Sequence, residues 1–169
     1  FGLGSMVIAS EILVTRTEMN LSNGWGMGFS IEDSAEVELS HGYFSENHNV
    51  AVAFSQSSGR VSSSLLERTK LSDYPAGDGL LASGAVVDAD NIIVRHNARV
   101  GVLYNDSEGE ISGSWITHNE IGLISQGIHE ASVTEDTVVE NNAQNLSLDG
   151  NLAVPDEKMP LPGSSDGGT

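Results

Sequence analysis

The stretch at residues 89–119 reads ADNIIVRHNARVGVLYNDSEGEISGSWITHN and contains two copies of one pattern. In each copy a small or apolar residue is followed after five positions by an aliphatic residue, and after three more by Asn. The two copies are Ala89, Val94, Asn97 and Ile111, Ile116, Asn119. They lie 22 residues apart. Self-similarity at a fixed period of about 20–50 residues indicates a stack of repeated structural units.

Four further copies extend the pattern over most of the chain, with Asn or Thr at the last position. They are Ala9/Val14/Thr17, Leu39/Phe44/Asn47, Val61/Leu66/Thr69 and Val133/Val138/Asn141. The six central residues are separated by 30, 22, 28, 22 and 22 positions, so the basic unit has 22 residues. Both long intervals carry their extra residues directly after the polar position, which predicts two inserted loops at one corner.

The residues between the copies alternate in short apolar runs interrupted by Gly, Asn and Ser, which excludes long helices. A unit of 22 residues has room for two or three short strands with their turns. The sequence therefore predicts an all-β fold, a right-handed parallel β-helix solenoid of about six coils with two inserted loops. The recurrent Asn47, Asn97, Asn119 and Asn141 are expected to form a ladder of stacked amides.

The charge balance is strongly acidic, with 7 Lys and Arg against 24 Asp and Glu and a net charge of −17. Nucleic acids and anionic membranes are disfavoured as partners, because both are bound through clustered Lys and Arg. No run of about 18 apolar residues exists, so membrane insertion is not expected either. The absence of Cys leaves the redox compartment open.

The organisation along the chain predicts one β-helix at residues 1–154 and a flexible linker or tail at 155–169, where three of the four prolines lie. No amphipathic capping helix precedes the first repeat, although solenoids normally cover their terminal edges. We therefore expect a fragment of a longer protein, with the flanking segments of that protein as partners.

A family resemblance rests on the strand endings Arg16-Thr17 and Arg68-Thr69, each followed by a Gly-containing insertion, a second Gly-apolar strand and an uninserted coil ending in Asn. Over about residues 7–150 the chain resembles bacterial right-handed parallel β-helix repeat proteins. The resemblance implies a secreted or surface protein. Members with known chemistry include pectin and alginate lyases, polygalacturonases, epimerases and phage tailspikes, but none of their catalytic motifs occurs here.

The inserted corner is the first candidate site. Two raised loops beside a short corner are expected to form a groove, and aromatic rings beside amides suit the stacking and hydrogen bonding of sugars. The candidate ligand-binding residues are Trp25, Tyr74, His48 and Asn23. Alternatively, the two aromatic side chains only pack the loops onto the coils.

Carboxylates at the same corner offer a catalytic alternative. A glycosidase needs two carboxylates that face one cleft, and a lyase needs a base. Glu46, Asp73 and Asp78 are the candidates for such a cluster, although their spacing is not diagnostic. Acidic substrates would be repelled by the net charge unless Ca²⁺ intervened.

Two further columns run along the predicted stack. The first column consists of the residues that directly precede the Asn or Thr of each repeat, namely Arg16, Glu46, Arg68, His96, His118 and Glu140. Cross-strand charge pairing explains it, and a metal-binding or acid–base pair of histidines is the alternative. The second column consists of the residues that directly precede the central apolar residue of each repeat, namely Leu13, Tyr43, Leu65, Ile93, Trp115 and Thr137. Period two points it outward as an exposed stripe covered by a partner, unless a bulge turns it inward.

An acidic turn is a further candidate cation site. Asp106, Glu108 and Glu110 supply oxygen ligands of the kind that Ca²⁺ prefers, although no complete calcium-binding motif is present. A solvated acidic edge is the alternative, and no other cofactor is expected.

These observations predict a non-enzymatic extracellular or cell-surface module that acts as a scaffold or adhesin and binds a polysaccharide or cell-surface glycan. The alternative is a polysaccharide lyase or glycoside hydrolase domain that acts on uronate-type polymers. Regular coils without a catalytic constellation favour the first prediction.

Overall fold

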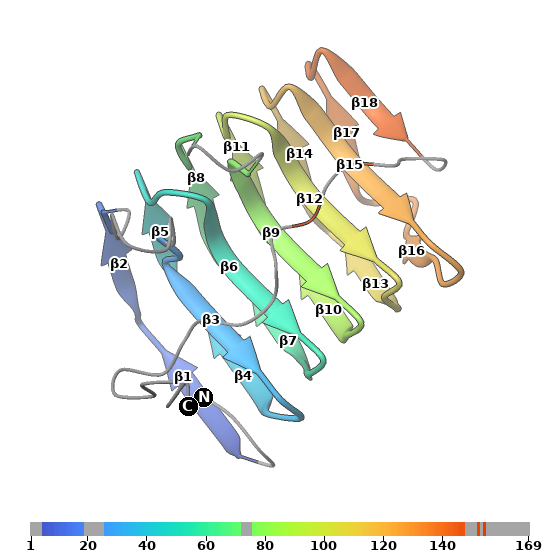
Figure 1. Ribbon diagram of the computed structural model, residues 1–169. Helices are drawn as coiled ribbons and strands as arrows, with labels where there is room; N and C mark the ends of the chain where they lie inside the picture. The colour runs from blue at the N-terminus through green and yellow to red at the C-terminus, as the bar shows by residue number, and fades with distance from the viewer. Residues whose placement is uncertain (1–4, 19–25, 72–75, 148–151, 153, 155–169) are drawn as a thin grey trace, which may run out of the picture.

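The computed structural model describes residues 5–18, 26–71, 76–147, 152 and 154. Their regular structure consists entirely of β-strands, which form three sheets of six parallel strands each (Figure 1). Nothing within these ranges forms a helix with the length and apolarity that a bilayer crossing requires.

Each circuit of the chain, called a coil below, adds one strand to each sheet. Sheet A contains β1 (Met6–Ser10), β4 (Glu36–Ser40), β7 (Ser58–Ser62), β10 (Val86–Asp90), β13 (Gly109–Ser112) and β16 (Ala131–Val133). Sheet B contains β2 (Leu13–Thr15), β5 (Tyr43–Ser45), β8 (Leu65–Glu67), β11 (Ile93–Arg95), β14 (Trp115–Thr117) and β17 (Val138–Glu140). Sheet C contains β3 (Phe29–Glu32), β6 (Val50–Ser55), β9 (Asp78–Ser83), β12 (Val100–Asn105), β15 (Ile121–Gln126) and β18 (Gln144–Ser147).

Neighbouring strands within a sheet are three strands apart in the sequence, so the chain visits sheets A, B and C in turn (Figure 1). All the strand pairs are parallel, and the pairing of Val94 with Ile116 shows the 22-residue offset of the repeat. The predicted all-β fold of short parallel strands is confirmed, and the arrangement is consistent with a parallel β-helix. The two predicted insertions fall mainly on residues 19–25 and 72–75, which lie outside the described residues.

The core lies between the three sheets and follows the period of two. In β4, Val37 and Leu39 are buried whereas Glu36 and Glu38 are exposed. The interior is mostly aliphatic, and its largest buried side chain is that of Tyr104. The Tyr104 hydroxyl donates a hydrogen bond of 2.6 Å to the Val87 carbonyl, so this polar group is satisfied within the core.

A ladder of side-chain amides links the coils at the end of sheet B. The Oδ1 atom of Asn119 accepts the backbone N–H of Asn97 at 2.9 Å, and the Nδ2 atom of Asn119 donates to the Val94 carbonyl at 3.2 Å. Asn97 makes the equivalent bonds to the Thr69 N–H and the Leu66 carbonyl. Each amide thus satisfies buried backbone groups of the preceding coil, which confirms the predicted ladder.

Glycine in sheet C permits the ladder to approach the backbone closely. A Cβ atom at Gly101 would lie 2.7 Å from Nδ2 of Asn119 and 2.6 Å from the Gly122 carbonyl oxygen. Gly79 and Gly122 face the next Asn of the ladder in the same way. Gly is therefore required at these positions because a larger residue would clash with the ladder Asn of the next coil.

The last coil departs from the predicted register. Trp115 pairs with Val138, and Ile116 pairs with Val139, so the prediction that Val138 is a core residue is wrong. The backbone N–H of Asn119 is bonded by Asn142, so the ladder continues there and not at Asn141. The physical reason is one extra residue in the turn between β16 and β17.

The same shift corrects the two columns. Asn141, with a φ of 55°, replaces Glu140 in the column before the ladder, and Val138 replaces Thr137 in the outward column. Side chains of this longer turn bond to the equivalent turn of the preceding coil. Asp136 accepts the backbone N–H of Gly113, and Thr137 accepts that of Ser114, so the extra residue is accommodated.

The outer face of sheet C is apolar and covered. Val50, Leu81, Val100, Leu103 and Ile124 are buried there, and Leu152 and Val154 pack against this group. The side-chain amide of Gln126 bonds both the N–H and the carbonyl of Leu152 at 3.0 Å. Sheet C is thus unavailable as a binding face over these residues.

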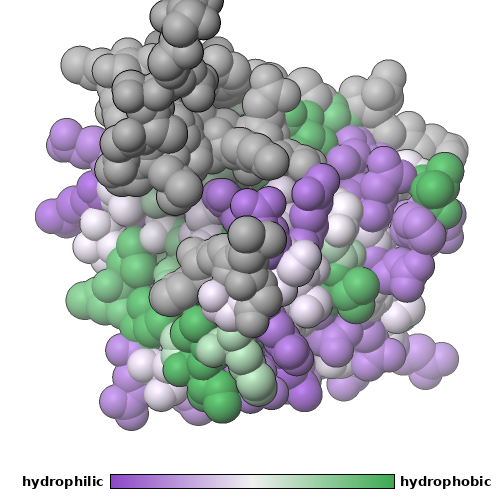
Figure 2. Space-filling model, turned by 60° about the horizontal axis from the view of Figure 1, so that its bottom comes forward, coloured by the Kyte–Doolittle hydropathy of each residue, from purple (hydrophilic) through white to green (hydrophobic). Residues whose placement is uncertain are grey.

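The first coil is more exposed than those above it. Met6, Ile8 and Leu13 are 62%, 71% and 69% exposed, because they point outward from the terminal strands of sheets A and B. Figure 2, which brings the lower end of Figure 1 forward, shows hydrophobic side chains gathered among hydrophilic ones.

We predict that Asn97→Ala lowers the free energy of unfolding by about 2–4 kcal/mol, because two buried backbone groups each lose a hydrogen-bond partner. The matched control is Thr69→Val on the neighbouring coil. Thr69 is 1% exposed and its Oγ1 atom has no hydrogen-bond partner among the described residues. Its replacement is expected to leave stability unchanged or higher. Urea unfolding followed by circular dichroism measures both, and equal losses would contradict the ladder.

Candidate ligand-binding face

The outer face of sheet B carries a continuous apolar row. Register places one residue of each coil in it, and we call the set the apolar row: Leu13, Tyr43, Leu65, Ile93, Trp115 and Val138. Tyr43 is 36% exposed and Trp115 is 43% exposed. The prediction that this column points outward is therefore confirmed for its first five members, and the bulge that would turn it inward is absent there.

A polar network lies beside the apolar row, two residues further along the strands. Its centre is Glu67, which is only 2% exposed. The Glu67 carboxylate accepts hydrogen bonds from the Tyr43 hydroxyl at 2.9 Å and from Arg95 Nε at 2.8 Å. It also accepts one from Arg68. One buried carboxylate therefore fixes an aromatic ring and two guanidinium groups on three neighbouring coils.

The surroundings of Glu67 favour its charged form. Desolvation raises the pKa of this carboxyl, but the hydrogen bonds from Arg95 and Tyr43 and the charges of Arg68 and Arg95 outweigh it and hold the pKa below the ordinary value of 4.5. Glu67 is thus an ionised anchor at neutral pH.

The column before the ladder forms the corner between sheets B and C. Its members, the corner column, are Arg16, Glu46, Arg68, His96, His118 and Asn141. All six have a φ between 55° and 58°, a conformation that turns the chain sharply and costs non-glycine residues about 1 kcal/mol.

The predicted alternation of charges along the corner column is only partly present. Arg16 pairs with Glu46 at 3.4 Å, and Lys70 approaches the same carboxylate at 3.8 Å. Arg68 pairs instead with Glu67 of its own coil. The rings of His96 and His118 are neighbours, with centroids 5.0 Å apart. No group of three or more possible metal ligands occurs in the described part of the chain.

A hollow of about 390 Å³ lies on the other side of the apolar row, at the corner between sheets A and B. It is lined by small and polar residues of three successive coils together with two members of the apolar row. These residues are His41, Gly42, Ser63, Ser64, Leu65, Asn91 and Ile93. Polar groups therefore flank the apolar row on both sides.

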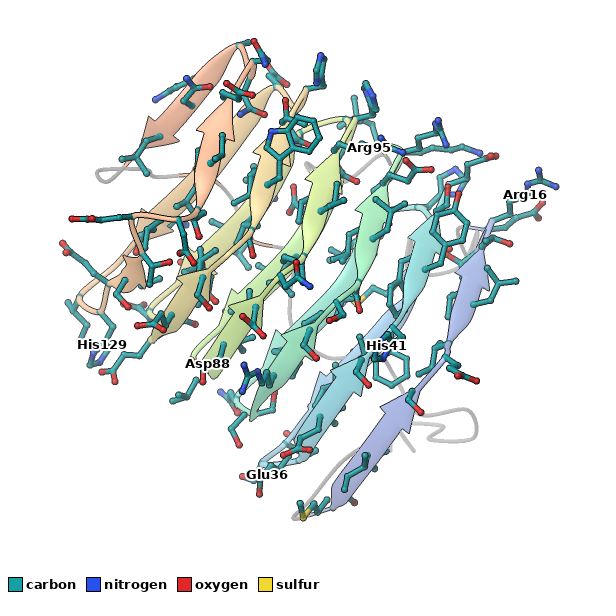
Figure 3. The ribbon with its side chains drawn as sticks, turned by 180° about the vertical axis from the view of Figure 1, so that it is seen from behind. Arg16, Glu36, His41, Asp88, Arg95 and His129 are labelled. Carbon is teal, nitrogen blue, oxygen red and sulfur yellow. The ribbon has the colours of Figure 1, made fainter. Side chains whose placement is uncertain are left out.

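Charges are segregated between the two ends of the sheet A and B surface. The exposed face of sheet A carries Glu36, Glu38, Asp88 and Glu110, whereas its one described cation, Arg60, pairs with Asp90 at 2.9 Å. In Figure 3, Glu36 and Asp88 lie along one edge, Arg16 and Arg95 lie at the opposite edge, and His41 lies between them.

Four of the six described Lys and Arg residues lie at the corner of sheets B and C. They are Arg16, Arg68, Lys70 and Arg95. Of the other two, Arg60 lies on sheet A and Arg99 is buried. The acidic chain thus presents one local concentration of cationic side chains, and it adjoins the apolar row.

The inserted corner is described only in part. Trp25, Tyr74, Asn23 and Asp73 lie outside the described residues, so the predicted groove stays a prediction. His48 is half-buried, and its Nδ1 atom lies 2.9 Å from the Thr17 carbonyl oxygen.

The carboxylates of the catalytic alternative do not share one exposed surface. Glu46 is partly exposed and pairs with Arg16 and Lys70. Asp78 is fully buried and forms an ion pair with Arg99 that includes a hydrogen bond of 2.8 Å from Nε. Burial raises the pKa of Asp78, and the hydrogen bonds and charge of Arg99 oppose that rise. The position of Asp78 is that of a structural carboxylate.

The three acidic residues considered for Ca²⁺ each have a separate environment. Asp106 accepts the backbone N–H of Ile128 at 2.8 Å, and Glu108 lies 2.7 Å from Nδ1 of His129. Glu110 is exposed on sheet A. The described residues thus do not bring these three side chains together as one group of ligands.

The sequence pattern identified part of this face. Tyr43 and Trp115 follow from period two as outward residues, and Arg68, His96 and His118 follow from the corner column. The role of Glu67 and Arg95 was missed because they stand between these two columns. Reading every repeat position as a column would have found them.

We predict that Glu67→Gln lowers the free energy of unfolding at neutral pH by about 1–3 kcal/mol, because two guanidinium groups lose their charged acceptor. The matched control is Glu46→Gln, a more exposed carboxylate on the same corner, with an expected loss below about 1 kcal/mol. Thermal or urea unfolding measures both variants. Equal losses would show that Glu67 is not an anchor.

The pH dependence has a definite sign. Because the folded pKa of Glu67 is lowered below 4.5, its stabilising contribution is complete above that value and is lost as the pH falls through the folded pKa. The stability difference between the native chain and Glu67→Gln is therefore expected to shrink below about pH 4.5. A difference that grows on acidification would contradict this assignment.

We predict that Asp78→Asn lowers the free energy of unfolding by about 3–5 kcal/mol, because it removes the negative charge that Asp78 places against the buried Arg99. Asp90→Asn, which breaks the exposed pair with Arg60, serves as the control with a loss below about 1 kcal/mol. Urea titrations at neutral pH compare the two. A stable Asp78→Asn protein would return Asp78 to the catalytic candidates.

Comparison of the chain with protein-family models finds no match. Comparison with curated proteins and with solved structures finds none either. The function of the chain is therefore inferred from its own residues and their geometry.

Proposed function

We propose that the protein is a right-handed parallel β-helix module of the cell surface or the extracellular space, and that it binds a glycan chain without catalysing its cleavage. The binding face is the outer face of sheet B. The observation that carries the proposal is the exposure of Tyr43 and Trp115 in one apolar row beside a fixed polar network. The extracellular location rests on the family resemblance.

The apolar row suits the faces of sugar rings. Rings of Tyr and Trp stack on the C–H faces of sugars and leave the hydroxyl groups free at the sides. The strands β8 and β11 separate β5 from β14, so Tyr43 and Trp115 stand three strand spacings apart, roughly 14 Å. Leu65 and Ile93 fill the interval. This span accommodates a short oligosaccharide that runs across the coils.

Polar groups on both sides of the apolar row suit the hydroxyl groups. Arg95 and the network of Glu67 lie on one side, and Ser63 and Asn91 line the hollow on the other. Tyr43 is itself fixed through its hydroxyl by Glu67. A face that is ordered before binding loses less conformational entropy when the ligand binds, which favours recognition by a rigid surface.

The lack of catalysis is supported by the placement of the carboxylates. Glycoside hydrolysis needs two carboxyl groups about 5–10 Å apart that face the same bond. Glu67 on sheet B is buried and bonded to Tyr43, Arg68 and Arg95, and Asp78 on sheet C is enclosed in its ion pair with Arg99. Neither is free to act on a ligand at the apolar row.

The test is a glycan-array screen of the full chain, followed by calorimetry with the best ligand. We expect Tyr43→Ala and Trp115→Ala each to weaken binding by about tenfold or more, because each removes a stacking surface. The control is Ile128→Ala, which truncates a side chain that is 87% exposed on another part of the surface. It should not change the affinity.

Trp25→Ala and Tyr74→Ala test the competing site at the inserted corner. Loss of binding in these two variants, with full binding in Tyr43→Ala and Trp115→Ala, would move the site away from sheet B. Absence of glycan binding in the native chain would overturn the proposed function.

A further inference from the structure

The corner column places two imidazole groups side by side at the edge of the proposed binding face. His96 and His118 are both exposed, and their ring centroids are 5.0 Å apart on adjacent coils. The Nδ1 atom of His118 lies 2.9 Å from Oγ1 of Thr117, which fixes the orientation of that ring. The remaining ring nitrogens are available to solvent or to a ligand.

Two guanidinium groups adjoin the histidine pair. Arg95 precedes His96 in the chain and is 37% exposed, and Arg68 occupies the corner column one coil earlier and is 52% exposed. Both share the carboxylate of Glu67. Two cations against one anion leave one net positive charge, and protonation of both histidines would raise it to three.

The same positive environment acts on the pKa of His96. Desolvation, followed by the positive charges of His118, Arg95 and Arg68, lowers its pKa below the ordinary value of 6.5, and only Glu67 acts in the opposite direction. Glu140 lies beyond this group, paired in register with Thr117. His96 is therefore held in its neutral form at neutral pH.

We propose that His96, His118, Arg68 and Arg95 form an anion-binding site that takes a carboxylate or sulfate substituent of the glycan bound along sheet B, and that it binds more tightly as the pH falls. The proposal rests on the proposed function for the class of its ligand. The ring stacks on the apolar row, and the acidic substituent reaches the corner column beside it. Imidazolium and guanidinium N–H groups donate charge-assisted hydrogen bonds to such an anion.

The geometry explains how a chain with a net charge of −17 can hold an acidic ligand. Exposed charges farther apart than about 10 Å are largely screened at physiological salt, so the local cations dominate at the corner. The carboxylates of sheet A lie at the opposite edge of this surface (Figure 3). The segregation of charge thus creates a positive corner on an acidic protein.

The sign of the pH effect follows from linkage. An anion binds protonated imidazoles better than neutral ones, so binding of the anion is coupled to proton uptake. Affinity is expected to increase as the pH falls from about 7.5 to about 5, by about fivefold or more. A neutral glycan is not expected to show this change.

The first experiment follows the histidine ring signals of the full chain by NMR as a function of pH, with and without inorganic sulfate. Sulfate is expected to raise the titration midpoints of His96 and His118 and to leave those of His48 and His129 unchanged. Equal effects on all four, or no effect on the first two, would overturn the anion site. Because no glycan is involved, this result is independent of the proposed function.

The second experiment compares an oligogalacturonate with a neutral galactose oligomer of equal length by calorimetry at about pH 5 and pH 7.5. We expect the acidic ligand to bind more tightly at the lower pH, and His96→Gln with His118→Gln to abolish that pH dependence. His129→Gln, which changes the histidine that pairs with Glu108, is the control and should retain the pH dependence.

The outcomes separate the two proposals. Equal binding of both ligands at both pH values, still lost in Trp115→Ala, would leave the glycan face intact and overturn the acidic preference. A pH-dependent preference that persists in the His96→Gln, His118→Gln protein would overturn the assignment to these residues. Sulfate binding without binding of either oligosaccharide would overturn the glycan ligand and the proposed function.

Discussion

The stacking of amides between coils is the interaction on which the remaining structure depends. Asn97 and Asn119 each bond an N–H and a carbonyl of the preceding coil in a region from which water is excluded. The close approach of Gly101 to Asn119 brings sheet C against the same ladder. A buried backbone group without a partner costs as much as a lost hydrogen bond, so this ladder holds the coils at one register.

The fixed register has a consequence for the surface. When every coil repeats the same turns, equivalent residues form columns along the stack. The apolar row and the corner column are products of this rule. Ligand recognition along such a surface needs no loop to close, because the side chains are already aligned at the strand spacing of about 4.8 Å.

Charge is distributed by the same rule. Several outward positions of sheet A carry carboxylates, whereas most of the described cations occupy the corner of sheets B and C. Glu67 stabilises this corner, since its carboxylate fixes two guanidinium groups that would otherwise repel each other. The net charge of the chain alone would suggest a surface that repels acidic ligands everywhere. Because the cations are concentrated at one corner, away from the carboxylates of sheet A, this corner is an exception.

The sequence by itself determined the repeat, the all-β composition, the parallel pairing and the outward direction of Tyr43 and Trp115. These properties follow from local periodicity, which is a property of the chain and needs no knowledge of distant contacts. The register of the last coil was not determined, because one extra residue between Val133 and Val138 shifts every later residue by one position. Only the tertiary structure decided that Asp78 is buried against Arg99 and that Glu67 joins Tyr43, Arg68 and Arg95. Such contacts join coils 21 to 28 residues apart, and their existence depends on side-chain direction and burial, which the repeat pattern alone does not encode.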